Sequence, residues 1–141
     1  MRGKRAGVYD PGTADAWKHA VADAWRAYVA PENAPQFRPY ETAVRVTLQF
    51  FMRRPKGHFR NFARMNPALS NSPPLKASAP LRHTQKPDVD NLAKAVLDVL
   101  TRLGAWTDDC LVASLIVSRN WAQSSPGCSI EIIEIDDLKQ R

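Results

Sequence analysis

The sequence predicts a single α/β domain in which helices pack against a mixed β-sheet. Stretches with helical and strand patterns follow one another in the order helix, strand, loop, helix, strand, strand, which is typical of sheets covered by helices. The 141 residues contain no internal repeat and no interior linker, so we expect one domain over residues 1–141. A domain of this length buries roughly two-thirds of the surface that its unfolded chain exposes, so it needs no disulfide or metal to fold.

Basic and acidic residues are unevenly distributed along the chain, whose net charge is +6. The interval between Glu41 and Asp88 contains no acid and holds these basic residues: Arg45, Arg53, Arg54, Lys56, Arg60, Arg64, Lys76, Arg82 and Lys86. A basic run by itself is most often a solvated loop, although it also suits a polyanionic partner. Acids follow this run directly, and the combination favours a nuclease, because cations hold phosphates while carboxylates hold a metal ion.

No stretch of about 18 apolar residues is available to cross a bilayer, and the start MRGKRAGVYDPG lacks the apolar stretch of a signal peptide. We therefore expect a cytoplasmic protein with no membrane association. Cys110 and Cys128 are too few and too far apart for a zinc site or a disulfide framework, so we expect both to be reduced.

The N-terminal part of the chain is expected to form a loop and a helix. Residues 2–12 predict a basic loop that ends in an Asp-Pro-Gly turn, after which Thr13 caps a helix over residues 14–30. The helix carries one apolar stripe at three- and four-residue spacing, formed by Trp17, Ala20, Val21, Ala24, Trp25 and Tyr28. Aromatic residues on such a stripe can stack on bases, but a place in the core explains them better.

The middle of the chain predicts one strand and one long loop. Residues 40–52 alternate and are rich in β-branched and aromatic side chains, with Arg45, Thr47 and Gln49 on the opposite face. Pro, Ser and Asn are frequent over residues 53–86, which argues against regular structure there apart from a short helix at 59–64. We interpret residues 53–86 as a basic mobile loop that orders on DNA, because long irregular segments in a compact domain are usually functional.

The chain is organised around residues 86–109, KPDVDNLAKAVLDVLTRLGAWTDD. Pro87 precedes a predicted helix and Gly104 suits the residue after its end. The apolar residues of that helix recur with a 3.6-residue period: Leu92, Val96, Leu97, Leu100 and Leu103. The polar residues that flank its ends or follow its start are the candidates for chemistry: Asp88, Asp90, Lys94, Asp108 and Asp109.

Two further strands are expected after this helix, over residues 111–121 and 129–135. The intervening Gln-Ser-Ser-Pro-Gly is expected to join them as a hairpin loop. Glu131 and Glu134 do not share one face of the last strand, so the pattern leaves its register open.

The acids at the start of the helix suit a divalent cation. Paired carboxylates repel each other, and magnesium, which prefers carboxylate oxygens and keeps several waters, would remove this repulsion and activate a water against a phosphate. Lys94, one helical turn from Asp90, would contact the scissile phosphate, stabilise its charge or orient the nucleophile. Taken singly, Asp90 also suits a helix N-terminus and Lys94 an ordinary surface pair, but together with Asp109 they favour a metal site.

The distance between the acids constrains how they can meet. A helix of about 14 residues is roughly 20 Å long, and residues 104–109 extend at most about 20 Å. Asp109 therefore joins Asp88 and Asp90 within one chain only if this segment runs back along the helix almost fully extended. We expect this one-chain arrangement, and the alternative is that the third acid comes from a neighbouring subunit.

Residues 81–121 contain three spaced motifs: His83-x-x-Lys86-Pro87-Asp88-Val89-Asp90-Asn91-Leu92-x-Lys94, Leu97-Asp98-x-Leu100 and Trp106-x-Asp108-Asp109-x-x-Val112. In these motifs the chain resembles the RusA family of Holliday-junction resolvases, common in phages and prophages. The basic residues before Val8-Tyr9-Asp10-Pro11 and the helix after it are also similar to the family's N-terminal part.

This resemblance implies a RusA-like α/β fold and a homodimer that binds four-way DNA junctions and makes paired, symmetric nicks with Mg²⁺, for which Mn²⁺ would substitute. Asp88, Asp90 and Asp109 would be the metal-binding acids and Lys94 the essential lysine. The candidate contacts to the DNA backbone are Arg53, Arg54, Lys56, Arg82 and Lys86. The protein would act in DNA recombination and repair in a bacterial or phage-infected cell.

One departure from the family pattern concerns the start of the chain. Members of the family begin with a β-strand and a proline-containing turn before the basic loop, whereas this chain opens at the loop, with Arg2, Lys4 and Arg5. Either the chain starts late or the protein builds its sheet without that strand. We therefore expect the first family strand to be missing, which would leave a sheet edge exposed.

The leading hypothesis is thus a magnesium-dependent, structure-selective endodeoxyribonuclease that cuts DNA junctions. The first alternative is a catalytically silent junction-binding protein whose acids serve as caps and ion pairs. The second is an unrelated basic interaction protein with structural acids, in which Asp90→Asn would change stability by only a few tenths of a kcal/mol.

Overall fold

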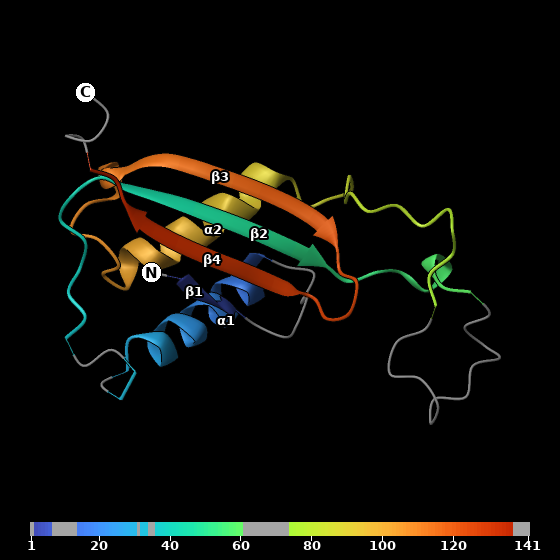
Figure 1. Cartoon of the computed structure of the whole chain (residues 1–141), viewed down its shortest axis with the longest axis horizontal. Helices are drawn as coiled ribbons and strands as arrows, with labels where there is room; N and C mark the ends of the chain where they lie inside the picture. The colour runs from blue at the N-terminus through green and yellow to red at the C-terminus, as the bar shows by residue number, and fades with distance from the viewer. Residues whose placement is uncertain (1, 7–13, 31, 34–35, 61–73, 137–141) are drawn as a thin grey trace.

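The computed structural model, shown in Figure 1, describes residues 2–6, 14–30, 32–33, 36–60 and 74–136. These residues form a four-stranded sheet in the order β1-β4-β2-β3, made by β1 (Arg2–Ala6), β2 (Val44–Met52), β3 (Val112–Trp121) and β4 (Gly127–Glu134). β2 and β3 run parallel, and β4 is antiparallel to both β1 and β2. The predicted α/β fold with a mixed sheet is confirmed.

β2 lies inside the sheet because one of its faces is uniformly apolar. The side chains on that face are buried: Val44, Val46, Leu48, Phe50 and Met52. Leu48 is opposite Ile130 of β4 on one side and Val117 of β3 on the other. The predicted start of this strand at residue 40 is four residues too early, since Tyr40 instead forms an isolated bridge with Trp106.

Two helices, α1 (Ala14–Tyr28) and α2 (Val89–Arg102), cover one face of the sheet (Figure 1). The predicted stripe of α1 lies in the core, where the rings of Trp17 and Phe50 meet edge to face at 5.6 Å. α1 also packs along α2, whose Val96 and Leu100 are fully buried. The proposed Thr13 cap lies outside the described residues. No helix in the described ranges is long and apolar enough to span a membrane.

Residues 2–6 form strand β1 rather than the basic loop that we expected. β1 is antiparallel to β4, with Arg2 opposite Glu131 and Ala6 opposite Cys128. The loop prediction failed because a strand of sequence RGKRA has no apolar alternation, so the pattern carries no signal for it. The edge of β4 that a missing first strand would leave exposed is therefore covered by β1.

β3 and β4 do not form the predicted hairpin, because β2 lies between them. Residues 122–126 cross the end of β2, where the N–H of Ala122 donates to the carbonyl oxygen of Met52 over 2.7 Å. A short connection with Pro and Gly can join two neighbouring strands, or it can cross over one strand that lies between them. The second case requires a span of about 10 Å, which is two inter-strand spacings of about 4.8 Å. The hairpin prediction was wrong because the turn residues do not show which strand takes the central place.

The described parts of segment 53–86, residues 53–60 and 74–86, extend from the end of the sheet in Figure 1 and are hydrogen-bonded to it. A 3₁₀ turn, η1 (Lys56–His58), is followed by a bridge between Phe59 and Leu75. The N–H of Trp121 donates to the carbonyl oxygen of Leu81 over 2.8 Å. Phe59 is thus not part of the expected helix at 59–64. Residues 61–73 lie outside the described residues, and they contain most of that expected helix and part of the segment that we expected to be mobile.

Candidate active site

The acids Asp88 and Asp90 lie where the chain enters α2. The order β2, α2, β3 with parallel strands makes a β-α-β unit, so the helix runs back along the sheet and its N-terminus lies near the carboxyl ends of the strands. Ligands of open α/β sheets bind outside these strand ends. The fold therefore places the two predicted acids at the end of the sheet that most often carries a site.

Asp88 occupies the N-cap position of α2, but its side chain accepts no hydrogen bond from the helix. Its Oδ2 instead accepts a hydrogen bond of 2.8 Å from Nζ of Lys86. This hydrogen bond, aided by the charges of Lys86 and Arg119, lowers the pKa of Asp88 below its usual value. The carboxylate is thus ionised at neutral pH, and its lysine partner is 84% exposed, so the ion pair contributes little stability and is readily exchanged.

Arg119, which the sequence analysis did not single out, holds the segment that leads into Asp88. Its Nη1 donates to the carbonyl oxygen of Gln85 over 2.7 Å and also to that of Pro87. Arg119 belongs to β3 and is opposite Phe50 of β2, so the sheet fixes its position. The sequence contains one indication of this role, because Arg119 is the only charged residue in the strand VASLIVSRNW. A lone charge near the end of a strand indicates a specific partner.

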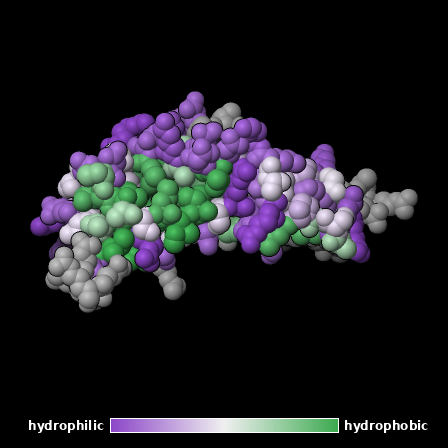
Figure 2. Space-filling view, turned by 90° about the horizontal axis from the view of Figure 1, so that it is seen from above, coloured by the Kyte–Doolittle hydropathy of each residue, from purple (hydrophilic) through white to green (hydrophobic). Residues whose placement is uncertain are grey.

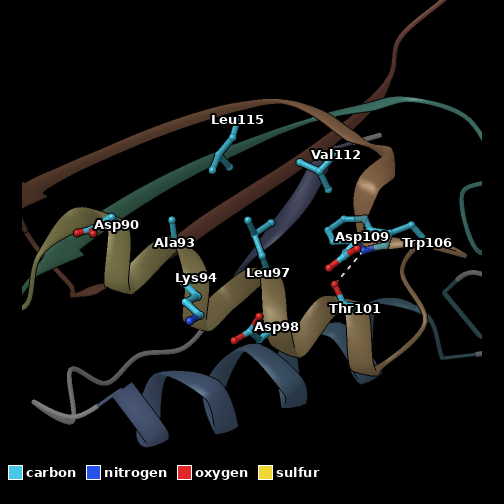
Figure 3. Close-up of a pocket in the computed structure, with 10 residues that line it drawn as sticks. All are labelled: Asp90, Ala93, Lys94, Leu97, Asp98, Thr101, Trp106, Asp109, Val112 and Leu115. Atoms are coloured by element: carbon cyan, nitrogen blue, oxygen red, sulfur yellow. Dashed lines mark hydrogen bonds between the residues drawn. The ribbon is translucent and has the colours of Figure 1, made fainter.

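Asp90 and Lys94 are exposed side chains one helical turn apart on α2. Both line a groove of about 420 Å³ that runs between α2 and β3 (Figure 3). In the part of the chain that the structure describes, neither of them forms a salt bridge, although their spacing permits one. The ammonium group of Lys94 is therefore available to an anionic ligand beside Asp90.

The groove has an acid at each end, and between them it is lined by apolar residues and by the polar side chains of Lys94, Asp98 and Thr101 on α2 (Figure 3). Asp90 lies at one end and Asp109 lies at the other, next to Trp106. Trp106 is held there because its Nε1 donates to Oγ1 of Thr101 over 3.0 Å. The apolar lining between the two ends comes from both elements: Ala93 and Leu97 of α2, and Val112 and Leu115 of β3.

Asp108 and Asp109 have different roles at the C-terminal end of the groove. Asp108 caps the 3₁₀ turn η3 (Asp109–Leu111), because its Oδ1 accepts a hydrogen bond of 2.9 Å from the N–H of Cys110. This hydrogen bond lowers the pKa of Asp108. Asp109 is exposed and lines the groove, so it is the more available carboxylate at this end.

The structure does not bring the three predicted metal-binding acids together. Asp90 lies at the N-terminal end of α2, next to Asp88, whereas Asp109 lies at the C-terminal end of the same helix (Figure 3). Across the described ranges, no three His, Cys, Asp or Glu side chains are close enough to share a metal ion. Exposed carboxylates are suitable donors for magnesium, but one chain offers only two of the three at one place. The expected one-chain arrangement is not formed.

The segment after α2 cannot run back along the helix because it is fixed at the helix end. Gly104 turns the chain with φ at 78°, in the left-handed region that favours glycine. The N–H of Ala105 donates to the carbonyl oxygen of Leu100 over 3.0 Å, and its own carbonyl oxygen accepts from the N–H of Tyr40 over 2.9 Å. Trp106, buried beside these residues, completes the anchor.

The predicted DNA contacts lie on the segment that extends from the same end of the sheet. Arg54 is half-buried and bonded to the main chain: its Nε donates to the carbonyl oxygen of Ala122 and its Nη1 to that of Pro80, both over 2.8 Å. Arg54 thus ties this segment to the sheet. The other four side chains are exposed: Arg53, Lys56, Arg82 and Lys86.

Two histidines at the base of this segment pack on Trp121. The ring centroids of His83 and Trp121 are 4.4 Å apart, and those of His58 and Trp121 are 4.9 Å apart. His83 is 5% exposed. This ring cluster therefore anchors the segment to the end of β3, and the structure gives His83, the first residue of the motif, a structural role.

An α/β domain that presents paired carboxylates, a nearby lysine and exposed basic side chains at one end of its sheet has the features of a nuclease. A family model described as Endodeoxyribonuclease RusA matches residues 1–133 of the chain. The chain belongs to this family of crossover junction endodeoxyribonucleases, which hydrolyse phosphodiester bonds in DNA. No curated protein matches the chain.

Proposed function

We propose that this protein is a magnesium-dependent, structure-selective endodeoxyribonuclease that resolves four-way DNA junctions by paired nicks, in recombination and repair, and that it acts as a homodimer. One observation carries the proposal. Asp88, Asp90 and Lys94 lie together at the N-terminal end of α2, at the same end of the sheet as the exposed basic side chains. A surface that only binds DNA gains nothing from carboxylates beside phosphates, since like charges repel.

In this proposal Asp88 and Asp90 are metal-binding acids, and Asp109 is the third. When bound, Mg²⁺, or Mn²⁺ in its place, supplies a water of lowered pKa and neutralises charge on the phosphate. The Oδ2 of Asp88 would be available to hold the cation, because its present partner, Lys86, is exposed and its ion pair is weak. Lys94 donates to an oxygen of the scissile phosphate and stabilises the negative charge that develops there.

The exposed basic side chains hold the DNA backbone next to these acids. Contacts from lysine and arginine to phosphates position the substrate without reading its sequence. The four-way junction is then selected by the shape that it presents to this end of the sheet. The proposed contacts are Arg53, Lys56, Arg82 and Lys86, while Arg54 acts by holding the segment in place.

The test compares wild type, Asp90→Asn and Asp23→Asn on a synthetic four-way junction and on a linear duplex, with and without magnesium. Asp23 is the matched control, because it is an exposed acid on α1 with only a long surface ion pair to Arg26 at 3.5 Å. We expect wild type and Asp23→Asn to nick the junction only with magnesium, and Asp90→Asn to lose on the order of 10²-fold or more in rate while still binding. Full cleavage by Asp90→Asn would contradict the assignment.

A catalytically silent junction-binding protein is the second candidate. Two observations favour it: Lys86 already occupies an oxygen of Asp88, and Asp109 is remote from Asp88 and Asp90 in the same chain. This candidate predicts that wild type and Asp90→Asn bind the junction equally and that neither cuts it with any divalent cation.

A further inference from the structure

A second groove lies between α1 and α2, which run side by side in Figures 1 and 3. This α1–α2 groove has a volume of about 510 Å³ and shares no lining residue with the groove that carries Asp90 and Asp109. Ala22 of α1 and Val99 of α2 line it and are buried. Because the side chain of alanine is small, the helices leave room between their outer faces at this point.

The α1–α2 groove has a basic rim. Among the described residues, three basic side chains and one acidic side chain line it: Lys18, Arg26, Arg102 and Asp15. Arg26 already has an exposed ion pair with Asp23 at 3.5 Å. In the described ranges of the chain, neither Lys18 nor Arg102 forms an ion pair. Both cations are therefore available to a ligand that enters the groove.

The helix dipole accounts for part of this charge pattern but not for Lys18. Asp15 in the first turn of α1 and Arg102 in the last turn of α2 each lie at the helix end that favours their charge. Lys18 lies in the N-terminal half of α1, where the dipole favours an acid, and it is half-buried at the groove. Two cations that line one groove repel each other, so their placement indicates an anionic ligand.

The α1–α2 groove lies toward the opposite end of α2 from the exposed basic side chains of segment 53–86. Arg102 is the last residue of α2 and Asp90 is its second, so about 18 Å of helix separates them. Segment 53–86 extends from the end of the sheet where α2 begins (Figure 1). The acids and the lysine at the start of α2 therefore lie between two basic surfaces.

The outer face of α2 connects these two basic surfaces. Its exposed charged side chains follow one another at a spacing of one helical turn and alternate in sign: Asp90, Lys94, Asp98 and Arg102. Figure 2, which looks onto the β3 edge, shows hydrophilic side chains gathered around one hydrophobic patch. A strand of DNA that follows α2 thus meets a hydrophilic surface with a cation near each end.

We propose that the α1–α2 groove binds the phosphodiester backbone of the DNA arm that leaves the cleavage site toward the C-terminal end of α2, through Lys18 and Arg102. The inference rests on the proposed function for the identity of the substrate. A DNA strand rises 3.4 Å per nucleotide, so about 18 Å corresponds to about five nucleotides. The DNA is then held on both sides of the nick, by segment 53–86 on one side and by this groove on the other.

A DNA backbone suits the groove better than a small anion does. The basic side chains are spread along it, since Lys18 and Arg26 are about 12 Å apart along the axis of α1. A single phosphate needs donors that converge on one point, whereas a DNA strand presents one negative charge every 3.4 Å. Contacts of this kind fix the position of the arm without reading its sequence.

The first test measures binding in EDTA, so it needs neither metal nor cleavage. Fluorescence anisotropy of a labelled four-way junction gives Kd over a range of salt concentrations for wild type, Lys18→Gln, Arg102→Gln and Arg45→Gln. Arg45 is the matched control, because it lies on the face of β2 opposite the buried Val44 and Val46, which face the helices. Circular dichroism shows that each variant is folded.

Each groove variant is expected to lose one phosphate contact. The plot of log affinity against log salt should become less steep by about one, and binding at about 0.1 M salt should weaken about tenfold. Arg45→Gln should match wild type. An unchanged slope in either groove variant overturns the proposal, and so does an equal change in Arg45→Gln, since the effect would then be one of net charge.

Removal of the acid in the groove should have the opposite effect. Asp15→Asn takes away a repulsion between this carboxylate and the phosphates, so junction affinity should rise by about two- to threefold. A damaged fold cannot produce such a gain. Glu131→Gln is the control, because Glu131 is opposite Thr47 on the face of the sheet away from the helices, and its affinity should not change. An Asp15→Asn variant that binds no more tightly than wild type overturns the proposal.

Neutral phosphates locate the contact on the DNA. Single phosphates of the junction are replaced in turn by uncharged methylphosphonates, and each junction is titrated with wild type and with the double variant Lys18→Gln/Arg102→Gln. About five nucleotides from the nick, wild type should lose about tenfold in affinity and the double variant should lose little, because its contact is already gone. Equal losses by both proteins at every position overturn the proposal.

Cleavage separates this inference from the proposed function. If all the binding results are as expected but wild type nicks no junction with magnesium or manganese, the proposed function is refuted and the groove remains a DNA-binding surface. If wild type nicks the junction with magnesium while Lys18→Gln and Arg102→Gln bind it as tightly as wild type, the proposed function stands and the role of the groove is overturned.

Discussion

Substitution of Arg119 by methionine tests whether the sheet positions the acids. Methionine keeps an unbranched stem but removes the two hydrogen bonds from Nη1 to the carbonyl oxygens of Gln85 and Pro87. A hydrogen bond from a charged donor contributes about 1.5–3 kcal/mol. Both hydrogen bonds come from the same Nη1 of a half-buried side chain, so we do not add them and expect a total loss of about 2 kcal/mol. For a domain of this length, about 3–4 °C per kcal/mol gives a fall in Tm of about 6–8 °C.

The same substitution should reduce cleavage more than binding. The segment over residues 85–87 leads directly into Asp88, and a displacement of about 1 Å in a site costs on the order of 10²-fold in rate. Without Arg119 the pKa of Asp88 also rises toward its usual value, because one of the charges that lower it is gone. Single-turnover nicking of a four-way junction at saturating protein measures the rate. The pH at which this rate falls on the acid side should be higher for the variant than for wild type.

Arg26→Met is the control for this substitution. Arg26 lies on α1 and has only an exposed ion pair to Asp23 at 3.5 Å, so its loss should change stability by less than about 0.5 kcal/mol. Thermal denaturation followed by circular dichroism compares the two variants. If Arg119→Met unfolds at the wild-type temperature and nicks at the wild-type rate, Arg119 does not position the acids and the reasoning is refuted.

Two further predictions concern the cysteines and the charge of the molecule. Burial raises the pKa of Cys128 to about 12, and the hydrogen bond to Asp108 raises the pKa of the exposed Cys110 thiol. Since only the thiolate reacts, a disulfide reagent at pH 8 should modify one thiol in the folded protein and two in denaturant, and Asp108→Ala should speed the first reaction. Two reactive thiols in the folded protein would contradict the burial of Cys128. For DNA, the logarithm of junction affinity should fall linearly with the logarithm of salt concentration, with a slope that becomes less steep by about one for each of Arg82→Ala and Lys56→Ala. A slope that neither substitution changes would exclude these phosphate contacts.

The sequence alone was enough to predict most of the elements and to indicate the family. Alternation over β2 and the 3.6-residue period over α2 are local signals, and the structure confirms both elements. The motif around Asp88, Asp90 and Lys94 also led to the family that the comparison confirms. Such signals are readable because the spacing of apolar residues records which face of an element is buried.

Tertiary structure alone decided what these elements contact. Strand β1 has no pattern of its own and exists as a strand because β4 offers an edge. β2 separates β3 from β4, so a turn that looks like a hairpin crosses a strand. The partners of Arg119 lie more than 30 positions earlier in the chain, at Gln85 and Pro87. These outcomes depend on which surfaces compete for one another in space, and a periodic pattern records burial but not the identity of the partner.

The positions of the acids show most clearly what the sequence determines and what only the tertiary structure determines. Spacing left two arrangements open, because residues 104–109 were just long enough to return along the helix. Hydrogen bonds from Ala105 and Tyr40 hold that segment at the end of α2 instead, and Asp109 stays there. The sequence thus shows the residue types that metal chemistry needs. The distance between them depends on the turn at Gly104 and on the two backbone hydrogen bonds, which form only in the folded chain.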